Sequence, residues 1–396
     1  MTDDRELQAV RALVSAARAV GRGTTSMRVS LGMAHALVPR DLVPSGLADE
    51  LWPDLEEAAA AVEPLPWKDV EKVLKDAWDG KPSDELDDLD TTPHVVTAAT
   101  QTHLGAREGR AVAVTVLRPG LAGIVRSDLA LADQLVGPAR AAFPSVDVQA
   151  VVREARERVL DDLDMEHVAG HQRSLHRALR RHPDLAVAAP LTDLSHAGVL
   201  VREHVDGTPI LELTAEEDRR RAAELLLRFA GGAVRHGSVV ADLRPDTLVL
   251  DRDGRLVVLE AAGLAKVGAD RADLAVAALE ALRDGDDDAA AQVIARLGAL
   301  PAEQARVAAA LGRELIGEVA GDGPHTLDLA LARTVLERVD DRLRDVLALA
   351  EHATLPPSDL WPLRGLGQVV VLVLRLGATV DWLPIVRDAA RDGWGD

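Results

Sequence analysis

The stretch at residues 239–263, VVADLRPDTLVLDRDGRLVVLEAAG, decides the fold of this chain. Its polar tetrapeptide DRDG lies between two apolar runs, LVL and LVVL, and this pattern is typical of a β-hairpin with a tight turn. One acid, Asp242, precedes the hairpin, and a second, Glu260, follows its last apolar residue. The segment has the outline of a catalytic loop, a hairpin and a metal-binding turn, and Asp242 is the one residue of such a unit that is clearly in place.

The composition excludes several classes of function. A chain of 396 residues fits two lobes or domains. The net charge of −20 argues against general binding to nucleic acid or to anionic lipid headgroups, and an aromatic content of 2% leaves few side chains for base stacking. The absence of cysteine excludes disulfides, thiolate metal sites and cysteine nucleophiles. We therefore expect no nucleic-acid partner.

The sequence predicts no membrane span. Its N-terminus, MTDDRELQAV, is acidic and polar, unlike a signal peptide. The longest apolar run, 368–380, is shorter than the roughly 20 residues that a spanning helix needs, and Arg375 interrupts it. We expect a cytoplasmic protein, with peripheral attachment to a membrane as an open alternative.

Apolar periodicity and turn residues predict an α+β chain that is mostly helical. Helices are expected at 5–38 (with a break at GRGTTS), 47–62, 67–80, 121–135, 148–179 and 215–235, and almost continuously from 269 to the end. Strands are expected at 98–105, 111–120, 186–194 and 198–207, and the acidic segment 83–93 reads as a solvated turn. This order is the layout of a bilobal protein-kinase-like fold: an N-terminal helical extension (1–90), a small β-rich N-lobe (91–206) and a larger helical C-lobe that carries the hairpin (207–396).

Motifs spread over nearly the whole chain, from about residue 25 onward, resemble the UbiB/AarF/ADCK family of atypical kinases, and its actinobacterial branch most of all. The segment TAATQTH places Gln101 and His103 on the Gln and His of the family's nucleotide loop. VAVTVLRPG matches the lysine strand, except that Thr115 stands in place of the lysine. VREHVDGTPI resembles the hinge, which implies that Glu203 and Val205 contact a nucleotide.

The remaining motifs match the family in their order and spacing, but many of the side chains that the family uses for catalysis are replaced. DLDMEHVAGH resembles the helix motif, with Asp162 and Asp164 as its ion-pair acids and Val168 in place of a glutamate. VADLRPDT keeps the catalytic Asp242, but the loop's two histidines become Val240 and Arg244 and its metal-binding Asn becomes Thr247. In LEAA, Glu260 replaces the metal-binding aspartate and two alanines, Ala261 and Ala262, replace the Phe and Gly. Of the N-terminal K-x-G-Q motif, Arg28 is at best a remnant.

The resemblance implies ATP and Mg²⁺ as cofactors, and these substitutions argue against both. Phosphoryl transfer depends on the lysine, the metal and the base acting together, because it is mostly positioning and charge neutralisation. Each retained residue has a structural alternative: Asp242 as a cap on backbone N–H groups, Glu260 as an arginine-paired or solvent-facing carboxylate, and Gln101 and His103 as ordinary loop hydrogen-bonding residues. The outline of an active site is kept, and we interpret the chain as a pseudokinase.

Three functions from different classes stay open. The favoured one is a regulatory or scaffolding pseudokinase that binds a protein partner or biosynthetic enzyme complex. The second is a residual Mg²⁺-dependent ATPase or kinase that uses Asp242 and Glu260. The third is a carrier of an apolar small molecule such as an isoprenoid, because the family is associated with quinone and lipid pathways and the 363–386 segment is amphipathic.

Overall fold

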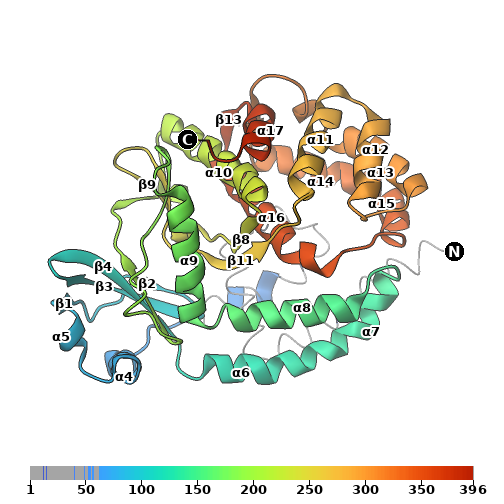
Figure 1. The fold of residues 1–396 in the computed structure, drawn as a ribbon. Helices are drawn as coiled ribbons and strands as arrows, with labels where there is room; N and C mark the ends of the chain where they lie inside the picture. Colours follow the sequence, from blue (N-terminus) through green and yellow to red (C-terminus); the bar gives the residue numbers. More distant parts are fainter. Residues whose placement is uncertain are drawn as a thin grey trace.

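The computed structural model describes residues 62–395 together with positions 12, 15, 40, 49, 52–54, 56 and 57. The helices expected at 5–38 and 47–62, and Arg28, lie largely or wholly outside the described residues. The described elements confirm an α+β architecture that is mostly helical. Figure 1 shows strands β1–β4 gathered at one end and the helices from α10 onward at the other, with α6–α8 running along one side.

The helices have the following bounds: α4 Trp67–Trp78, α5 Pro82–Glu85, α6 Leu121–Asp128, α7 Asp133–Ala142, α8 Val148–Asp161, α9 Met165–Leu179, α10 Glu216–His236, α11 Arg271–Asp284, α12 Asp287–Arg296, α13 Ala302–Ile316, α14 Leu329–Asp341, α15 Leu343–Ala350, α16 Leu360–Leu376 and α17 Trp382–Asp392. The strands are β1 Asp88–Leu89, β2 Val95–Val96, β3 Thr100–Arg107, β4 Arg110–Leu117, β5 Leu185–Val187, β6 Val199–Glu203, β7 Gly207–Pro209, β8 Ser238–Asp242, β9 Leu248–Asp251, β10 Leu256–Val258, β11 Ala262–Lys266, β12 His325–Leu327 and β13 Ala378–Val380.

The first sheet has the order β1-β3-β4-β6, with β2 on the edge of β3. Its central hairpin turns at Glu108 and Gly109, whose φ values of 51° and 72° suit the tight turn expected there. Because side chains alternate along β4, Val112, Val114 and Val116 face one side and pack with Val70 and Leu74 of α4. The other face carries Leu117 and Leu200, which pack against α9.

The acidic segment 83–93 is mostly exposed, as its charge predicted, but it is more than a turn. Helix α5 ends within it, and β1 pairs antiparallel with β3, with Asp88 opposite Ala106. Leu86 is buried in the cluster that α4 forms with the sheet. A single well-placed leucine thus anchors a segment whose composition suggested solvent.

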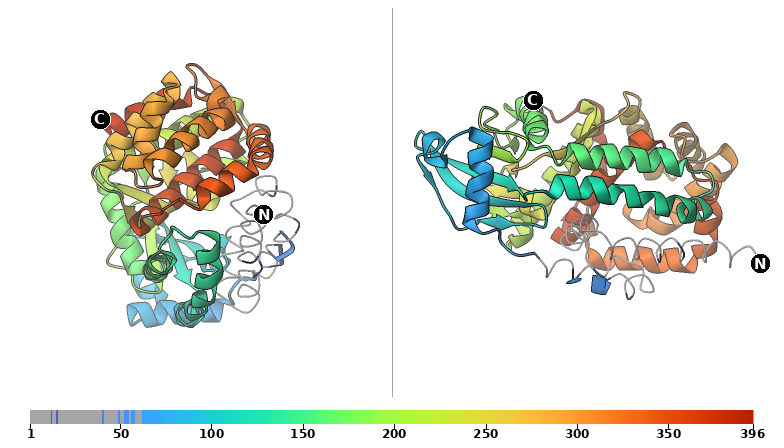
Figure 2. Two further views of the ribbon diagram at one scale, coloured as in Figure 1. Left: turned by 90° about the vertical axis from the view of Figure 1, so that its right-hand side faces the viewer. Right: turned by 90° about the horizontal axis from the view of Figure 1, so that it is seen from below.

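The helix expected over 148–179 is two helices. Helix α8 ends at Asp161, and α9 begins after Asp164, whose side chain accepts hydrogen bonds from the backbone N–H groups of Glu166 and His167. Aspartate at this position satisfies donors that a continuous helix would bond internally, so it favours a new helix start. The break lets α9 lie on the sheet while α7 and α8 extend beneath the C-lobe (Figures 1 and 2), where Ser145 donates to the carbonyl of Glu351 at 2.6 Å.

The larger lobe is built around α10. The hairpin predicted from residues 248–258 is present as β9 and β10, and it lies in a sheet of order β5-β10-β9-β7. Phe229 of α10 is almost fully buried among leucines and valines of this sheet and of α16. Beyond 269 the chain is helical, as expected, apart from the short pair β12 and β13.

Strand β5 departs from a simple division between lobes. It falls within the range expected for the N-lobe, 91–206, but it pairs in parallel with β10 of the second sheet. Its partner register, Leu185 with Leu256, places both leucines in the central core. The boundaries 1–90, 91–206 and 207–396 themselves stay predictions. In the part of the chain that the structure describes, no helix combines the length and the apolar composition needed to cross a bilayer.

Candidate functional site

The two acids of the opening stretch are brought together by the pairing of β8 with β11. Asp242, the last residue of β8, lies opposite Ala262, so Glu260 approaches it from two residues before the start of β11. Gly263 has a φ of 67°, a left-handed conformation that glycine adopts without strain. Both acids are only 6% exposed. The pairing of β8 with β11 therefore brings two carboxylates into one buried space.

An arginine lies between these carboxylates. Nη1 of Arg244 is 2.6 Å from Oδ2 of Asp242, and its Nη2 is 3.3 Å from Oε1 of Glu260. Its Nε is 3.4 Å from Oδ1 of Asp246. The side chain of Arg244 is 12% exposed. One guanidinium thus bridges the loop after β8 and the turn before β11, the two segments expected to be the catalytic loop and the metal-binding turn.

A second arginine reaches Asp242 from α16. Nη2 of Arg364 is 2.7 Å from Oδ1 of Asp242, and its Nη1 donates to the carbonyl of Ala241 at 2.7 Å. The next residue, Gly365, lies so close to Val240 that a Cβ atom would clash with the Val240 carbonyl oxygen. One turn further on, the side-chain oxygen of Gln368 accepts from the backbone N–H of Leu243 at 2.8 Å. Helix α16 therefore holds the catalytic loop by its backbone as well as by charge.

Electrostatics keep Asp242 ionised. Burial acts to raise the pKa of Asp242, but the guanidiniums of Arg244 and Arg364 outweigh it, so its pKa is lowered from the usual value. Burial likewise opposes the charge of Arg244, and the carboxylates of Asp246, Asp242 and Glu260 more than offset it, so the pKa of Arg244 rises. Such pairs hold because each charge would be expensive to leave buried alone. The carboxylate of Asp242 accepts from two guanidiniums, and the expectation that it caps backbone N–H groups was wrong.

Asp162 joins this site from the break between α8 and α9. Burial and the neighbouring charge of Asp242 raise its pKa to about 7, against the opposing effects of Arg364 and a hydrogen bond from the backbone of Gly263. The other predicted ion-pair acid, Asp164, caps α9 and is exposed. The structure thus brings Asp162 to Asp242 and leaves Asp164 with a local role.

The residues around Asp242 do not fit a magnesium ion as they stand. A hexacoordinate Mg²⁺ needs oxygen ligands at about 2.1 Å, and the space between Asp242 and Glu260 holds a cationic guanidinium. The hydroxyl of Thr247 is also engaged, since it donates to the carbonyl of Arg244 at 2.9 Å. No group of three or more metal-ligating side chains occurs among the described residues. Metal binding by Thr247 and Glu260 stays a prediction, and the arginine-paired alternative for Glu260 matches the geometry.

The predicted nucleotide residues of the N-lobe lie on opposite faces of its sheet. Thr115 faces α9, and its Oγ1 is 2.9 Å from Oγ1 of Thr102. Gln101 and His103 alternate to the other face, where Gln101 accepts from the backbone N–H of Leu65 and its Nε2 lies 3.0 Å from Nε2 of His103. Nucleotide contact by Gln101 and His103 stays a prediction, and their placement favours structural hydrogen bonding.

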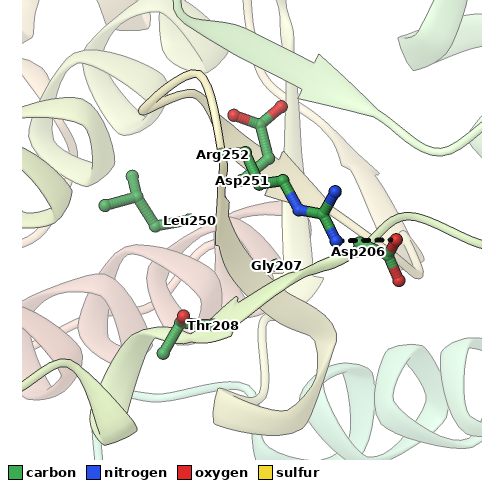
Figure 3. A pocket seen from close by; sticks show the side chains of 6 residues that line it. All are labelled: Asp206, Gly207, Thr208, Leu250, Asp251 and Arg252. Carbon is green, nitrogen blue, oxygen red and sulfur yellow. Dashed lines mark ion pairs between the residues drawn. The ribbon is translucent and has the colours of Figure 1, made fainter.

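The hinge residues connect the two sheets. Glu203 ends β6, and its Oε1 accepts from the backbone N–H of Ala189 at 2.8 Å, while Val205 is half-buried in the linker to β7. Beside this linker lies a pocket of about 340 Å³ (Figure 3). It is lined by Asp206, Gly207, Thr208, Leu250, Asp251 and Arg252. The ion pair of 3.5 Å that the figure draws between Arg252 and Asp206 is exposed and contributes little.

The sequence did not single out three residues that complete the site. Arg364 and Gln368 are polar residues four positions apart on α16, a helix that is otherwise apolar except for Arg375, and that spacing places them on one face. This pattern was a usable signal. Arg202, directly after the apolar residues 199–201 of β6, is 7% exposed. A charged residue inside a buried strand was a second usable signal.

Comparisons with known proteins agree with the kinase-like layout. Residues 58–294 match the family model described as the ABC1 atypical kinase-like domain. A protein from Cronobacter sakazakii named "Probable protein kinase UbiB" is 26% identical over 225 residues, which cover 54% of this chain and 40% of that protein. Its namesake from Pectobacterium carotovorum is 28% identical over 182 residues, covering 44% and 33%. The chain therefore spans less than half the length of these curated relatives.

A solved structure shares the fold over nearly the whole chain. The complex of Rv3197 with erythromycin from Mycobacterium tuberculosis superposes with a TM-score of 0.63, covering 91% of this chain and 89% of that one at 21% identity. The sequence-based expectation of a kinase-like fold is thereby confirmed.

Proposed function

Because this chain belongs to the ABC1 atypical kinase-like family, we propose that it is a catalytically impaired member that acts as a regulatory or scaffolding protein for a protein partner. The observation that carries this proposal is the guanidinium of Arg244 between Asp242 and Glu260. An aspartate can act as a base only when its carboxylate reaches the proton it accepts. Here both oxygens of that carboxylate are bound by arginines.

The charge balance supports the same proposal. In a working site the lysine and metal neutralise phosphate charge. In this chain Thr115 is a neutral residue at the lysine position, and its hydroxyl is paired with Thr102. The arginines instead neutralise the protein's own carboxylates, and this stabilises the folded loop. A protein partner would then recognise the surface of the lobes.

An activity comparison tests the proposal. Wild-type protein and Asp242→Asn are incubated with ATP and Mg²⁺ or Mn²⁺, and ADP release is measured, with Asp253→Asn in the exposed hairpin turn as the matched control. We expect no ADP release that depends on Asp242. Turnover by the wild type that is lost in Asp242→Asn but kept in Asp253→Asn would establish the alternative, a residual Mg²⁺-dependent ATPase or kinase using Asp242 and Glu260.

The scaffolding role has its own test in cells that encode this protein. We expect a gene carrying Asp242→Asn to restore the phenotype of a deletion, provided that the variant accumulates to wild-type levels. Failure of a well-folded variant to complement would contradict a role based on shape alone.

A second candidate, binding of an apolar small molecule, is favoured by helices α14 and α15. Both are amphipathic, yet neither contains a fully buried residue. Their leucines and valines are therefore only partly covered, as Val339 of α14 is. The structural neighbour was solved with erythromycin, a large and largely apolar macrocycle, which makes that compound a suitable probe.

Calorimetric titration with erythromycin tests this second candidate. We expect binding that Val339→Asp abolishes and that Glu337→Gln, an exposed substitution on the same helix, leaves unchanged. Equal binding by both variants would place the ligand elsewhere, and no binding by the wild type would remove the support for this class of ligand.

A further inference from the structure

Arg202 occupies the face of the N-lobe sheet that carries the vacant lysine position. In the pairing of β4 with β6, Arg202 lies opposite Ala113 and Leu200 lies opposite Thr115. Directly opposed residues share a face, so Arg202 and Thr115 lie on the same side of the sheet. This is the side away from α4, toward α9 and the turn that follows β10.

The guanidinium of Arg202 is buried without enough partners. The residue is 7% exposed, and Nη1 donates to the carbonyl of Glu203 at 3.2 Å. Its Nε has no hydrogen-bond partner in the part of the chain that the structure describes. Among the described residues no carboxylate lies within ion-pair distance of Arg202, whereas Arg244 has three such partners. A buried arginine with unused donors is unusual, because leaving such a group unsatisfied is costly.

The surroundings of Arg202 suit an anion that comes from outside the chain. Burial lowers the pKa of Arg202, and the more distant carboxylates of Glu260, Glu203 and Asp246 counteract this effect in part. The carboxylates of Glu260 and Asp246 are already bound by Arg244. The neighbouring polar groups include the hydroxyl pair of Thr102 and Thr115, in which one hydroxyl donates to the other and the second keeps its proton for an outside oxygen. They also include the imidazole of His94, whose pKa is lowered by burial, by His204 and by Arg202. Among the described groups around it, an incoming anion would meet the guanidinium of Arg202 and a neutral hydroxyl donor.

We propose that Arg202, together with the Thr102–Thr115 hydroxyl pair, binds a phosphoryl group of a small ligand without a metal ion. A phosphoryl group presents several oxygens in a tetrahedral arrangement, and these can accept from the guanidinium fork and from hydroxyls at once. The cation is thus supplied by β6 instead of β4. This inference goes beyond the scaffolding role: it requires binding, and no phosphoryl transfer follows from it.

Thermal melts and titrations in the presence of EDTA test the inference. The probes are ADP and inorganic pyrophosphate, with adenosine and malonate as controls for the base and for a plain dicarboxylate. A ligand that binds the folded state raises Tm. We expect Tm to rise with ADP, with pyrophosphate or with both, and not with adenosine or malonate. A rise in Tm with pyrophosphate would show that phosphate groups are sufficient for binding. A rise with ADP alone would show that the ligand must be a nucleotide.

Arg202→Met decides whether this arginine is responsible. We expect the Kd of the active probe to increase at least about tenfold, since a charge-assisted hydrogen bond is lost. We also expect the Tm of the ligand-free variant to stay the same or rise, because an uncompensated buried charge has been replaced by an apolar chain of similar length. Arg283→Met, on the exposed surface of α11, is the matched control and should leave both quantities unchanged.

Several outcomes would overturn the inference. These are a wild-type protein that responds to none of the phosphate probes in EDTA, a response that requires Mg²⁺, an equal response to malonate, and undiminished binding by Arg202→Met. If the methionine variant does not fold, Arg202→Gln replaces it, because glutamine keeps hydrogen-bond donors and removes the charge. The same loss of binding is then expected, and retained binding would assign Arg202 a structural role. The ADP-release comparison bears on the pseudokinase proposal and leaves this inference untouched.

Discussion

Arg244 and Asp242 form an ion pair of 2.6 Å in which the two side chains are 12% and 7% exposed. The resemblance of VADLRPDT to the family's catalytic segment predicts a histidine at this position, and the guanidinium of Arg244 also reaches Glu260. Arg244 thus neutralises the acid that the resemblance assigns to catalysis. The following expectations concern this network and the helix that supports it.

Arg244→Met should destabilise the protein strongly. The variant leaves Glu260 without its partner and removes one of two partners of Asp242, and breaking a buried pair from one side costs about 3–5 kcal/mol. Urea denaturation at neutral pH measures the change in the free energy of unfolding. Arg252→Met, whose side chain is 86% exposed, should change it by less than about 0.5 kcal/mol. Similar values for both variants would mean that the Arg244 network contributes little.

Asp242→Asn should lower the free energy of unfolding by about 3 kcal/mol, because the buried guanidinium of Arg244 and the partly exposed guanidinium of Arg364 lose their shared carboxylate. A cap on backbone N–H groups, the role that the sequence favoured, would contribute only about 1 kcal/mol. The same denaturation experiment distinguishes the two values. A loss near the lower figure would show that the ion pairs are offset by the desolvation of their charges.

Asp162 should make stability depend on pH in the opposite sense to an ordinary paired carboxylate. Its pKa is raised from 3.8 to about 7 in the folded state. The folded protein therefore holds the extra proton between these values, and the stability contribution is present below the ordinary pKa and is lost as the pH rises through 7. The slope attributable to this group is at most about 1.4 kcal/mol per pH unit.

Asp162→Asn isolates this contribution. The difference in the free energy of unfolding between wild type and variant should change across pH 4 to 7 and be constant above it, as followed by urea denaturation at several pH values. Asp253→Asn, in the exposed hairpin turn, should give a difference without that slope. A flat difference for Asp162→Asn would show that its carboxyl group titrates normally.

Gly365→Ala should disrupt the packing of α16 against the backbone of residues 240 and 241. An added Cβ would collide with backbone atoms of Val240 and Ala241, which cannot move aside as a flexible side chain could. We expect a loss of about 2 kcal/mol or more by thermal or urea denaturation. Gly367→Ala is two residues away on the same helix with open space around it, so it should stabilise by about 0.5–1 kcal/mol. Equal effects would contradict the close approach of α16.

Thr115→Lys should not create phosphotransfer activity by itself. The substitution restores a cation on β4, but Arg244 still occupies the space between Asp242 and Glu260. ADP release with Mg²⁺ should stay at background. We expect a rise only when Thr115→Lys is combined with Arg244→His, Thr247→Asn and Glu260→Asp. Activity of the single variant would show that the arginine does not block the site.

Local sequence patterns predicted the presence of helices and strands more reliably than the points at which one helix ends and the next begins. The hairpin at 248–258 and α10 were readable because their apolar spacing and turn residues act over short distances. The division of 148–179 into α8 and α9 was missed, because the apolar spacing continues through the break and the capping role of Asp164 is visible only once the helices diverge. The acidic segment 83–93 is exposed as predicted, but the burial of Leu86 within it was not foreseen, because that burial depends on α4.

The sequence by itself determined the kinase-like order of elements and the family, and it predicted the loss of side chains that phosphoryl transfer needs at 115, 247 and 260–262. Those properties are carried by residue identity and local spacing. Only the tertiary structure decided what the remaining charges do: Arg244 and Arg364 converge on Asp242, Asp162 joins them, and Arg202 is buried with no carboxylate of the described residues within ion-pair distance. Ion pairing depends on the distance between the charges and on their burial. Here Arg364 of α16 lies more than a hundred residues after the loop of Asp242, and Arg202 of the N-lobe sheet lies some forty residues before it. Residues so far apart in the chain meet only when the lobes pack, so no local pattern could have assigned their partners.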